Sequence, residues 1–110
     1  MLHSPGIFLQ GDLFISNIQC QLNRYNALKF DIESSIEFLG RGPSIQEIHG
    51  GCSNVAAYIY LCYTGRNSVK IDSREIVRLA QEGNEACQLP AFHAKVETDQ
   101  GITLYLSKQF

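Results

Sequence analysis

The chain has 110 residues, of which 45% are hydrophobic and 18% charged, and its formal net charge is −2. This composition excludes a disordered chain, and the length allows one domain, residues 1–110, with one core. The slight acidity argues against non-specific binding to nucleic acid, which requires many Lys and Arg side chains to neutralise phosphates.

Membrane insertion and export are not expected from this sequence. The longest uncharged apolar run, residues 55–63, is about half as long as the ~20 residues of a membrane-spanning helix. The amino terminus, residues 1–6, does not show the basic segment followed by a long apolar segment that is typical of a signal peptide. We therefore predict a cytoplasmic protein without a membrane partner. In a reducing cytosol we expect free thiols at all four cysteines, which are Cys20, Cys52, Cys62 and Cys87.

The first part of the chain alternates apolar and polar residues in the manner of strands. Residues 7–9 predict a short strand followed by a turn at 10–12, and residues 14–22 keep most apolar side chains on one parity. Residues 28–38 alternate more regularly, and a helix there would turn Phe30 into water. We therefore predict that 14–22 and 28–38 pair as an antiparallel meander.

The centre of the sequence is its most apolar part. Its uncharged run has no polar face, which predicts a buried helix over residues 53–64 with a glycine stop at each end. Upstream of this run, Ser44 and Glu47 fit a capping box. That pattern predicts one helical turn at residues 44–48.

The last third of the chain predicts a short strand, a helix and a hairpin. The strand covers 68–71, and Asp72 caps a helix over 73–82 that Gly83 and Asn84 end. The apolar face of this helix consists of Ile76, Val77, Leu79 and Ala80.

The hairpin has a defined register, because its two apolar sets share one face only if Val96 lies opposite Leu104. Residues 99–101 then form a three-residue loop with Gly101 in the left-handed conformation. Together the elements predict an α+β fold. Its antiparallel sheet combines the amino-terminal meander with the carboxyl-terminal hairpin, and the helices over 53–64 and 73–82 pack on one face.

Cys52 and His93 are the candidate catalytic residues. Cys52 follows two glycines at the start of the predicted central helix, and a helix amino terminus and a nearby imidazole both lower the pKa of a thiol. Gly51-Cys52-Ser53 before an apolar helix, with His93 on a later strand, resembles the layout of papain-like peptidases and amidases. The resemblance implies a cysteine-dependent hydrolase, although residues 102–106 contain no Asn, Asp or Glu to orient the histidine.

A metal site and a partner-binding surface are the other candidates. Thiolate and imidazole ligands would suit zinc, and the candidate ligands are His49, Cys52, Cys87 and His93. Without two tight ligand pairs, this set is weaker than a zinc signature, and we expect no cofactor. Aromatic and basic side chains of the central helix and the segment after it would form the partner surface, namely Tyr58, Tyr60, Tyr63, Arg66, Lys70, Arg74 and Arg78.

From these features we predict a small, non-enzymatic module that binds another protein or a second copy of itself. It would serve as an accessory or inhibitor protein that occupies a partner's surface. The alternative is the cysteine-dependent hydrolase. The two differ in one observable property, which is whether Cys52 is a reactive thiol.

Overall fold

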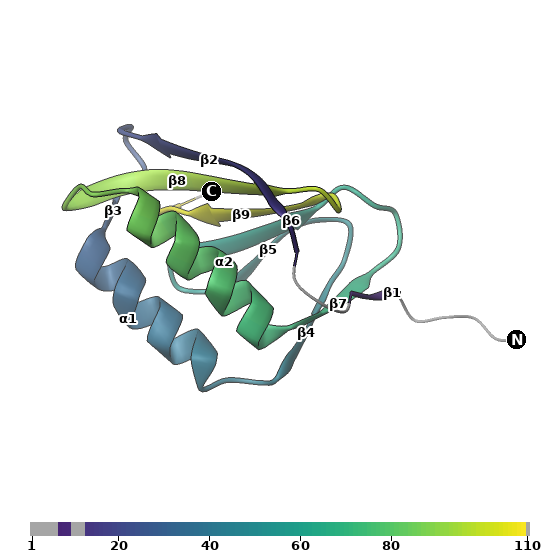
Figure 1. Cartoon of the computed structure of the whole chain (residues 1–110). Coiled ribbons are helices and arrows are strands. Elements are labelled where there is room, and N and C mark those ends of the chain that lie inside the picture. The colour runs from purple at the N-terminus through teal and green to yellow at the C-terminus, as the bar shows by residue number, and fades with distance from the viewer. Residues whose placement is uncertain (1–6, 10–12, 110) are drawn as a thin grey trace, which may run out of the picture.

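The computed structural model describes residues 7–9 and 13–109, and in these residues two helices cover one face of an antiparallel sheet (Figure 1). This arrangement confirms the α+β prediction. The elements in chain order are β1 (Ile7–Leu9), β2 (Ile15–Gln21), β3 (Ala27–Leu28), α1 (Lys29–Gly40), β4 (Ile45–Ile48), β5 (Gly51–Ala56), β6 (Ile59–Tyr63), β7 (Val69–Asp72), α2 (Ser73–Ala86), β8 (Ala91–Thr98) and β9 (Ile102–Leu106).

The main sheet has the strand order β2-β8-β9-β6-β5, and β3 also pairs with β8. Helix α2 packs over β2, β8 and β9, whereas α1 packs over β3, β5 and β6. Strands β6, β8 and β9 alternate fully buried and partly exposed side chains, so only the face under the helices belongs to the core. The largest fully buried side chains of these strands are Phe92, Ile59, Leu61, Ile102, Leu104 and Leu106.

A second, three-stranded sheet has the order β1-β7-β4. The chain connects it to the main sheet through β4, which leads into β5, and through β6, which leads towards β7. Within this sheet β7 pairs antiparallel with β4 and parallel with β1. Strand β7 runs directly into α2, where Asp72 is the predicted N-cap and its carboxylate accepts a hydrogen bond from the Arg74 amide.

The predicted strand at 7–9 is confirmed as β1, and the turn predicted at 10–12 lies outside the described residues.

The carboxyl-terminal hairpin has the predicted register. Val96 lies opposite Leu104, and Gly101 has a φ of 75° in the connecting loop. A Cβ atom added to Gly101 would lie 2.5 Å from Thr64 Oγ1, so both the backbone and the surroundings favour glycine there.

Gly101→Val should therefore lower the free energy of unfolding by about 2 kcal/mol, because a β-branched residue is strained at positive φ. Gln100→Val is the matched control, since Gln100 is exposed and its φ is not positive. Thermal denaturation followed by circular dichroism compares the two variants. Equal melting temperatures would contradict the proposed role of Gly101.

The helix predicted over 53–64 is wrong, because this segment forms the β5–β6 hairpin. Its turn consists of Ala57 and Tyr58, and Tyr58 has a φ of 67°. An apolar run without a polar face is compatible with a buried helix and with a buried strand. The β-branched and aromatic side chains of β6, with Ile59 and Leu61 buried and Tyr60 partly exposed, favour the strand.

The strand predicted over 28–38 is wrong as well, because residues 29–40 form α1. Its buried residues follow helical spacing and are Ile32, Ser35, Ile36 and Leu39. Phe30 and Phe38, which made the alternating pattern convincing, are 75% and 66% exposed. The predicted meander is therefore absent, and β2 pairs with β8 instead.

Two smaller predictions are also corrected. Residues 44–48 contain strand β4, which pairs with β7, rather than a helical turn. Helix α2 passes through Gly83 and Asn84 to Ala86, because Gly83 lies against the sheet inside the helix. Within the described residues, neither helix is long and apolar enough to span a membrane.

Candidate functional site

The four cysteines form two disulfides, so the prediction of free thiols is wrong. Cys20 on β2 is bonded to Cys87, directly after α2, and their Cα atoms are 5.7 Å apart. Cys52 and Cys62 lie directly opposite each other on β5 and β6 and are also bonded. The first disulfide ties the edge of the main sheet to the helix layer, and the second crosses the β5–β6 hairpin.

These bonds correct the catalytic interpretation of Cys52 and His93. Cys52 carries no thiol in the disulfide, and it begins no helix that could lower a thiol pKa. Cys52 shares a cross-strand row with Glu97 on β8, and His93 lies four residues before Glu97 on the same strand. The two candidate residues are thus three strand spacings apart, about 14 Å, before their separation along β8 is added.

The candidate metal ligands are not brought together either. Cys52 and Cys87 belong to different disulfides, which removes both thiolates from the set. His49 lies between β4 and β5, whereas His93 lies on β8. Within the described part of the chain, no group of three or more His, Cys, Asp or Glu residues is placed to hold a metal ion.

The face of the main sheet that the helices leave uncovered carries a row of polar and aromatic side chains. Lys95, Tyr105 and Tyr60 lie opposite one another on β8, β9 and β6, and each is partly exposed. Directly opposed residues of neighbouring strands have Cβ atoms about 5 Å apart, so the two tyrosines form a continuous surface. We use the term open face for the set Gln19, Tyr60, His93, Lys95, Glu97, Thr103 and Tyr105.

The open face combines charged and neutral groups. Lys95 Nζ lies 3.7 Å from a Glu97 carboxylate oxygen, and the rings of His93 and Tyr105 are 5.9 Å apart. Burial lowers the pKa of His93, whose Nδ1 lies 3.1 Å from Ser107 Oγ. Near neutral pH the imidazole is therefore mainly uncharged, and the open face has no strong net charge.

Of the three predicted partner-binding tyrosines, the structure places one on the open face. Tyr60 lies there, whereas Tyr58 and Tyr63 pack partly against the core. Tyr105, which we did not predict as a site residue, is the neighbour of Tyr60. Its position on the solvent-facing parity of the carboxyl-terminal hairpin was the signal that could have identified it.

The predicted basic residues do not form one cationic patch. The Arg74 guanidinium lies 2.7 Å from Asp72, and its hydrogen bond lowers the pKa of that carboxyl. Arg78 binds Glu75, for which burial opposes ionisation but hydrogen bonds from Arg78 and the Leu13 amide keep its pKa low. The remaining two lie apart from the helix, with Arg66 in the β6–β7 connection and Lys70 on β7. Their role in partner binding stays a prediction.

The comparisons with known proteins add no relative. No protein-family model, curated protein or solved structure gives a significant match to this chain. The functional argument therefore depends on the geometry of its surfaces.

Proposed function

We propose that this protein is a non-enzymatic binding module that contacts a partner protein through the open face. The observation that carries this proposal is the pair of neighbouring tyrosines, Tyr60 and Tyr105, on a sheet face that neither helix covers. Tyrosine offers a large apolar ring and a polar hydroxyl at small entropic cost, and it is enriched in protein interfaces. The Lys95–Glu97 pair supplies polar contacts beside the rings.

The two disulfides support an oxidising compartment as the place of action. The free thiols were predicted from a cytoplasmic location, whereas disulfides persist mainly where proteins are secreted or held outside the cytosol. They also support a binding rather than a hydrolytic role, since Cys52 offers no nucleophile while bonded to Cys62.

A double variant, Tyr60→Thr with Tyr105→Thr, tests the proposal while keeping residues that favour strands. A photo-crosslinking amino acid at Thr103, on the same face, should capture a partner from the native extract, and mass spectrometry identifies it. The purified partner should then bind the double variant at least tenfold more weakly, because interface tyrosines commonly contribute more than 1 kcal/mol each.

The matched control places the crosslinker at Gln88 and replaces Glu82 on α2 and Ser34 on α1, which are exposed residues away from the open face. These changes should leave the affinity within about twofold of the wild type. Equal binding by the tyrosine variant and the wild type would refute the open face as the contact surface.

A further inference from the structure

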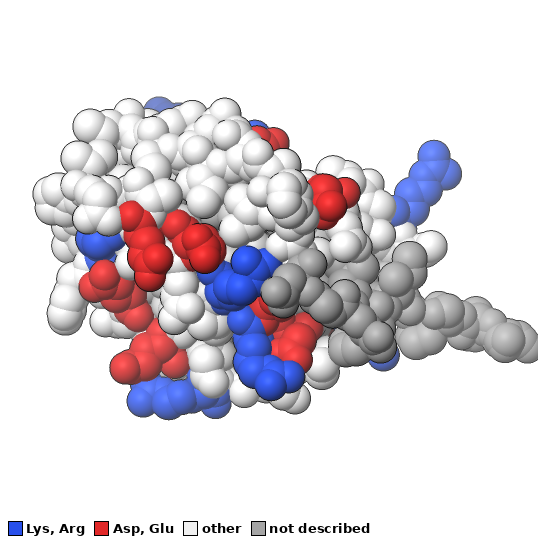
Figure 2. All heavy atoms as spheres, viewed as in Figure 1, with Lys and Arg blue, Asp and Glu red and all other residues white. Residues whose placement is uncertain are grey.

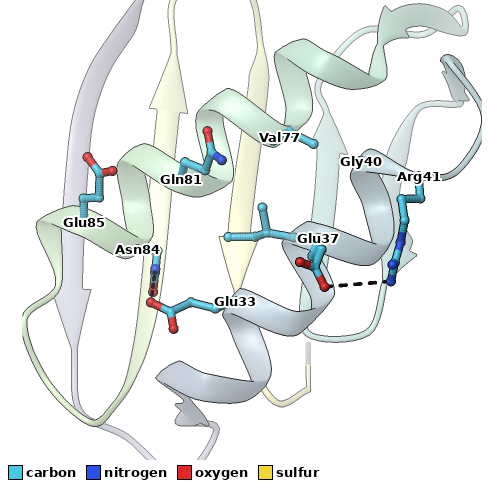
Figure 3. A pocket seen from close by; sticks show the side chains of 9 residues that line it. Glu33, Glu37, Gly40, Arg41, Val77, Gln81, Asn84 and Glu85 are labelled. Carbon is cyan, nitrogen blue, oxygen red and sulfur yellow. Dashed lines mark hydrogen bonds and ion pairs between the residues drawn. The ribbon is translucent and has the colours of Figure 1, made fainter.

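The two helices enclose a groove on the side of the molecule opposite the open face (Figure 3). Its volume is about 610 Å³, within the range of natural ligand pockets. The helices are antiparallel here, because Glu33 at the start of α1 lies beside Asn84 near the end of α2. The lining residues are Glu33, Ile36, Glu37, Gly40, Arg41, Val77, Gln81, Asn84 and Glu85.

The floor of the groove is apolar, and a glycine keeps it open. Ile36 on α1 and Val77 on α2, the latter labelled in Figure 3, are its aliphatic lining residues. A Cβ atom on Gly40 would lie 3.9 Å from Val77 Cγ2, so any side chain at this position would point across the groove. The absence of that side chain creates space for an apolar group from outside.

The rim of the groove is acidic. The lining has three carboxylates, Glu33, Glu37 and Glu85, and one cation, Arg41, so its net charge is −2. Arg41 lies 3.9 Å from Glu37, and both side chains are more than 70% exposed, so solvent screens this pair. Acidic side chains gather over the two helices in Figure 2.

The nearest other cation is directed elsewhere. Lys29 Nζ donates hydrogen bonds to the carbonyl oxygens of Asn84 and Cys87 at the end of α2. On α2, Arg74 and Arg78 are paired with Asp72 and Glu75. The rim carboxylates thus keep most of their capacity to bind positive charge from a partner.

An exposed aromatic side chain extends this surface along α1. Phe30 is 75% exposed, and it lies three and seven residues before Glu33 and Glu37, on the same side of the helix. A phenylalanine ring next to carboxylates can contact the alkyl chain or the charged group of Lys or Arg.

We propose that this groove binds a cationic segment of a partner protein, with an apolar side chain flanked by Lys or Arg residues. The apolar side chain fills the space over Ile36 and Val77, and the flanking cations bind Glu33, Glu37 and Glu85. Charge complementarity and the apolar floor together select this occupant over an acidic or purely polar one. Since the groove and the open face lie on opposite sides, the protein would hold two partners at once.

The test measures binding of a fluorescein-labelled peptide of alternating leucine and lysine residues by fluorescence anisotropy. Its counterpart carries glutamate in place of lysine. Gly40→Leu fills the groove without changing the charge and should weaken binding of the cationic peptide about tenfold or more. The double variant Glu37→Gln with Glu85→Gln should weaken it about fivefold.

Matched controls separate the groove from the general acidity of the helices. Gly42→Leu adds the same side chain just outside the groove, and Asp31→Asn with Glu82→Gln removes two carboxylates that do not line it. These variants should bind the peptide within about twofold of the wild type. The inference is overturned if they weaken binding as much as the groove variants, if Gly40→Leu binds normally, or if the glutamate peptide binds equally well.

The open-face variant Tyr60→Thr with Tyr105→Thr should bind the cationic peptide normally. The groove can therefore be tested even if the open face turns out not to bind a partner. Circular dichroism of each variant verifies its fold. If Gly40→Leu does not fold, the charge-neutralised pair and its control still decide the outcome.

Discussion

Replacing Cys20 and Cys87 together by alanine should lower the free energy of unfolding by about 4 kcal/mol. The two residues are 67 positions apart, and cross-links that close long loops remove the most conformational entropy from the unfolded chain. They join β2, an edge strand of the main sheet, to the residue directly after α2. Equilibrium denaturation in urea at pH 7 measures the loss.

The Cys52→Ala and Cys62→Ala pair is the control, because this disulfide closes a loop of only 10 positions within one hairpin. Its removal should cost about 3 kcal/mol by the same loop-entropy argument. A larger loss for the hairpin disulfide would contradict this assignment of roles.

The elements that the sequence predicted correctly have strong and unambiguous periods. Helix α2 combines an N-cap at Asp72 with an apolar face, and the β8–β9 hairpin alternates strictly around Gly101. In both cases the local preference agrees with the tertiary environment. For these segments the sequence pattern predicted the type of element and the hairpin register, although not the end of α2.

The segments that were predicted wrongly fit two periods about equally well. Phe30 and Phe38 supported a strand because a large aromatic residue was assumed to be buried, yet both are exposed on α1. The β5–β6 hairpin has no glycine, proline or asparagine in its two-residue turn, so Tyr58 gave no turn signal. Only packing against the rest of the chain distinguishes these alternatives.

The surfaces were less predictable than the fold. Tyr60 was identified, but its neighbour Tyr105 lies on another strand, and their adjacency depends on the β6–β9 pairing. The pairing of Cys20 with Cys87 likewise depends on how α2 crosses the sheet. The groove combines residues of two helices, one of which was predicted as a strand. Sites built by tertiary contacts require the fold first.

Gly83→Leu should destabilise the protein by about 3 kcal/mol, because this glycine lets α2 lie close against the sheet. A Cβ atom there would lie 2.8 Å from Val96 Cγ2 and 3.3 Å from Leu106 Cδ1, and both of these side chains are fully buried. A leucine must therefore push α2 away from β8 and β9, an overpacking that costs more than the gain of up to about 1 kcal/mol in helix propensity.

Gly40→Leu is the matched control, since it adds the same side chain to the end of α1, where the new Cβ meets only ordinary contacts. It should unfold at the same urea concentration as the wild type or a slightly higher one. Gly83→Ala should fall between the two, because its single methyl group displaces Val96 less than a leucine side chain does, while the helix gains stability. If Gly83→Leu were as stable as Gly40→Leu, α2 could not lie on β8 and β9 as closely as described, and the floor of the groove that α2 forms with α1 would change with it.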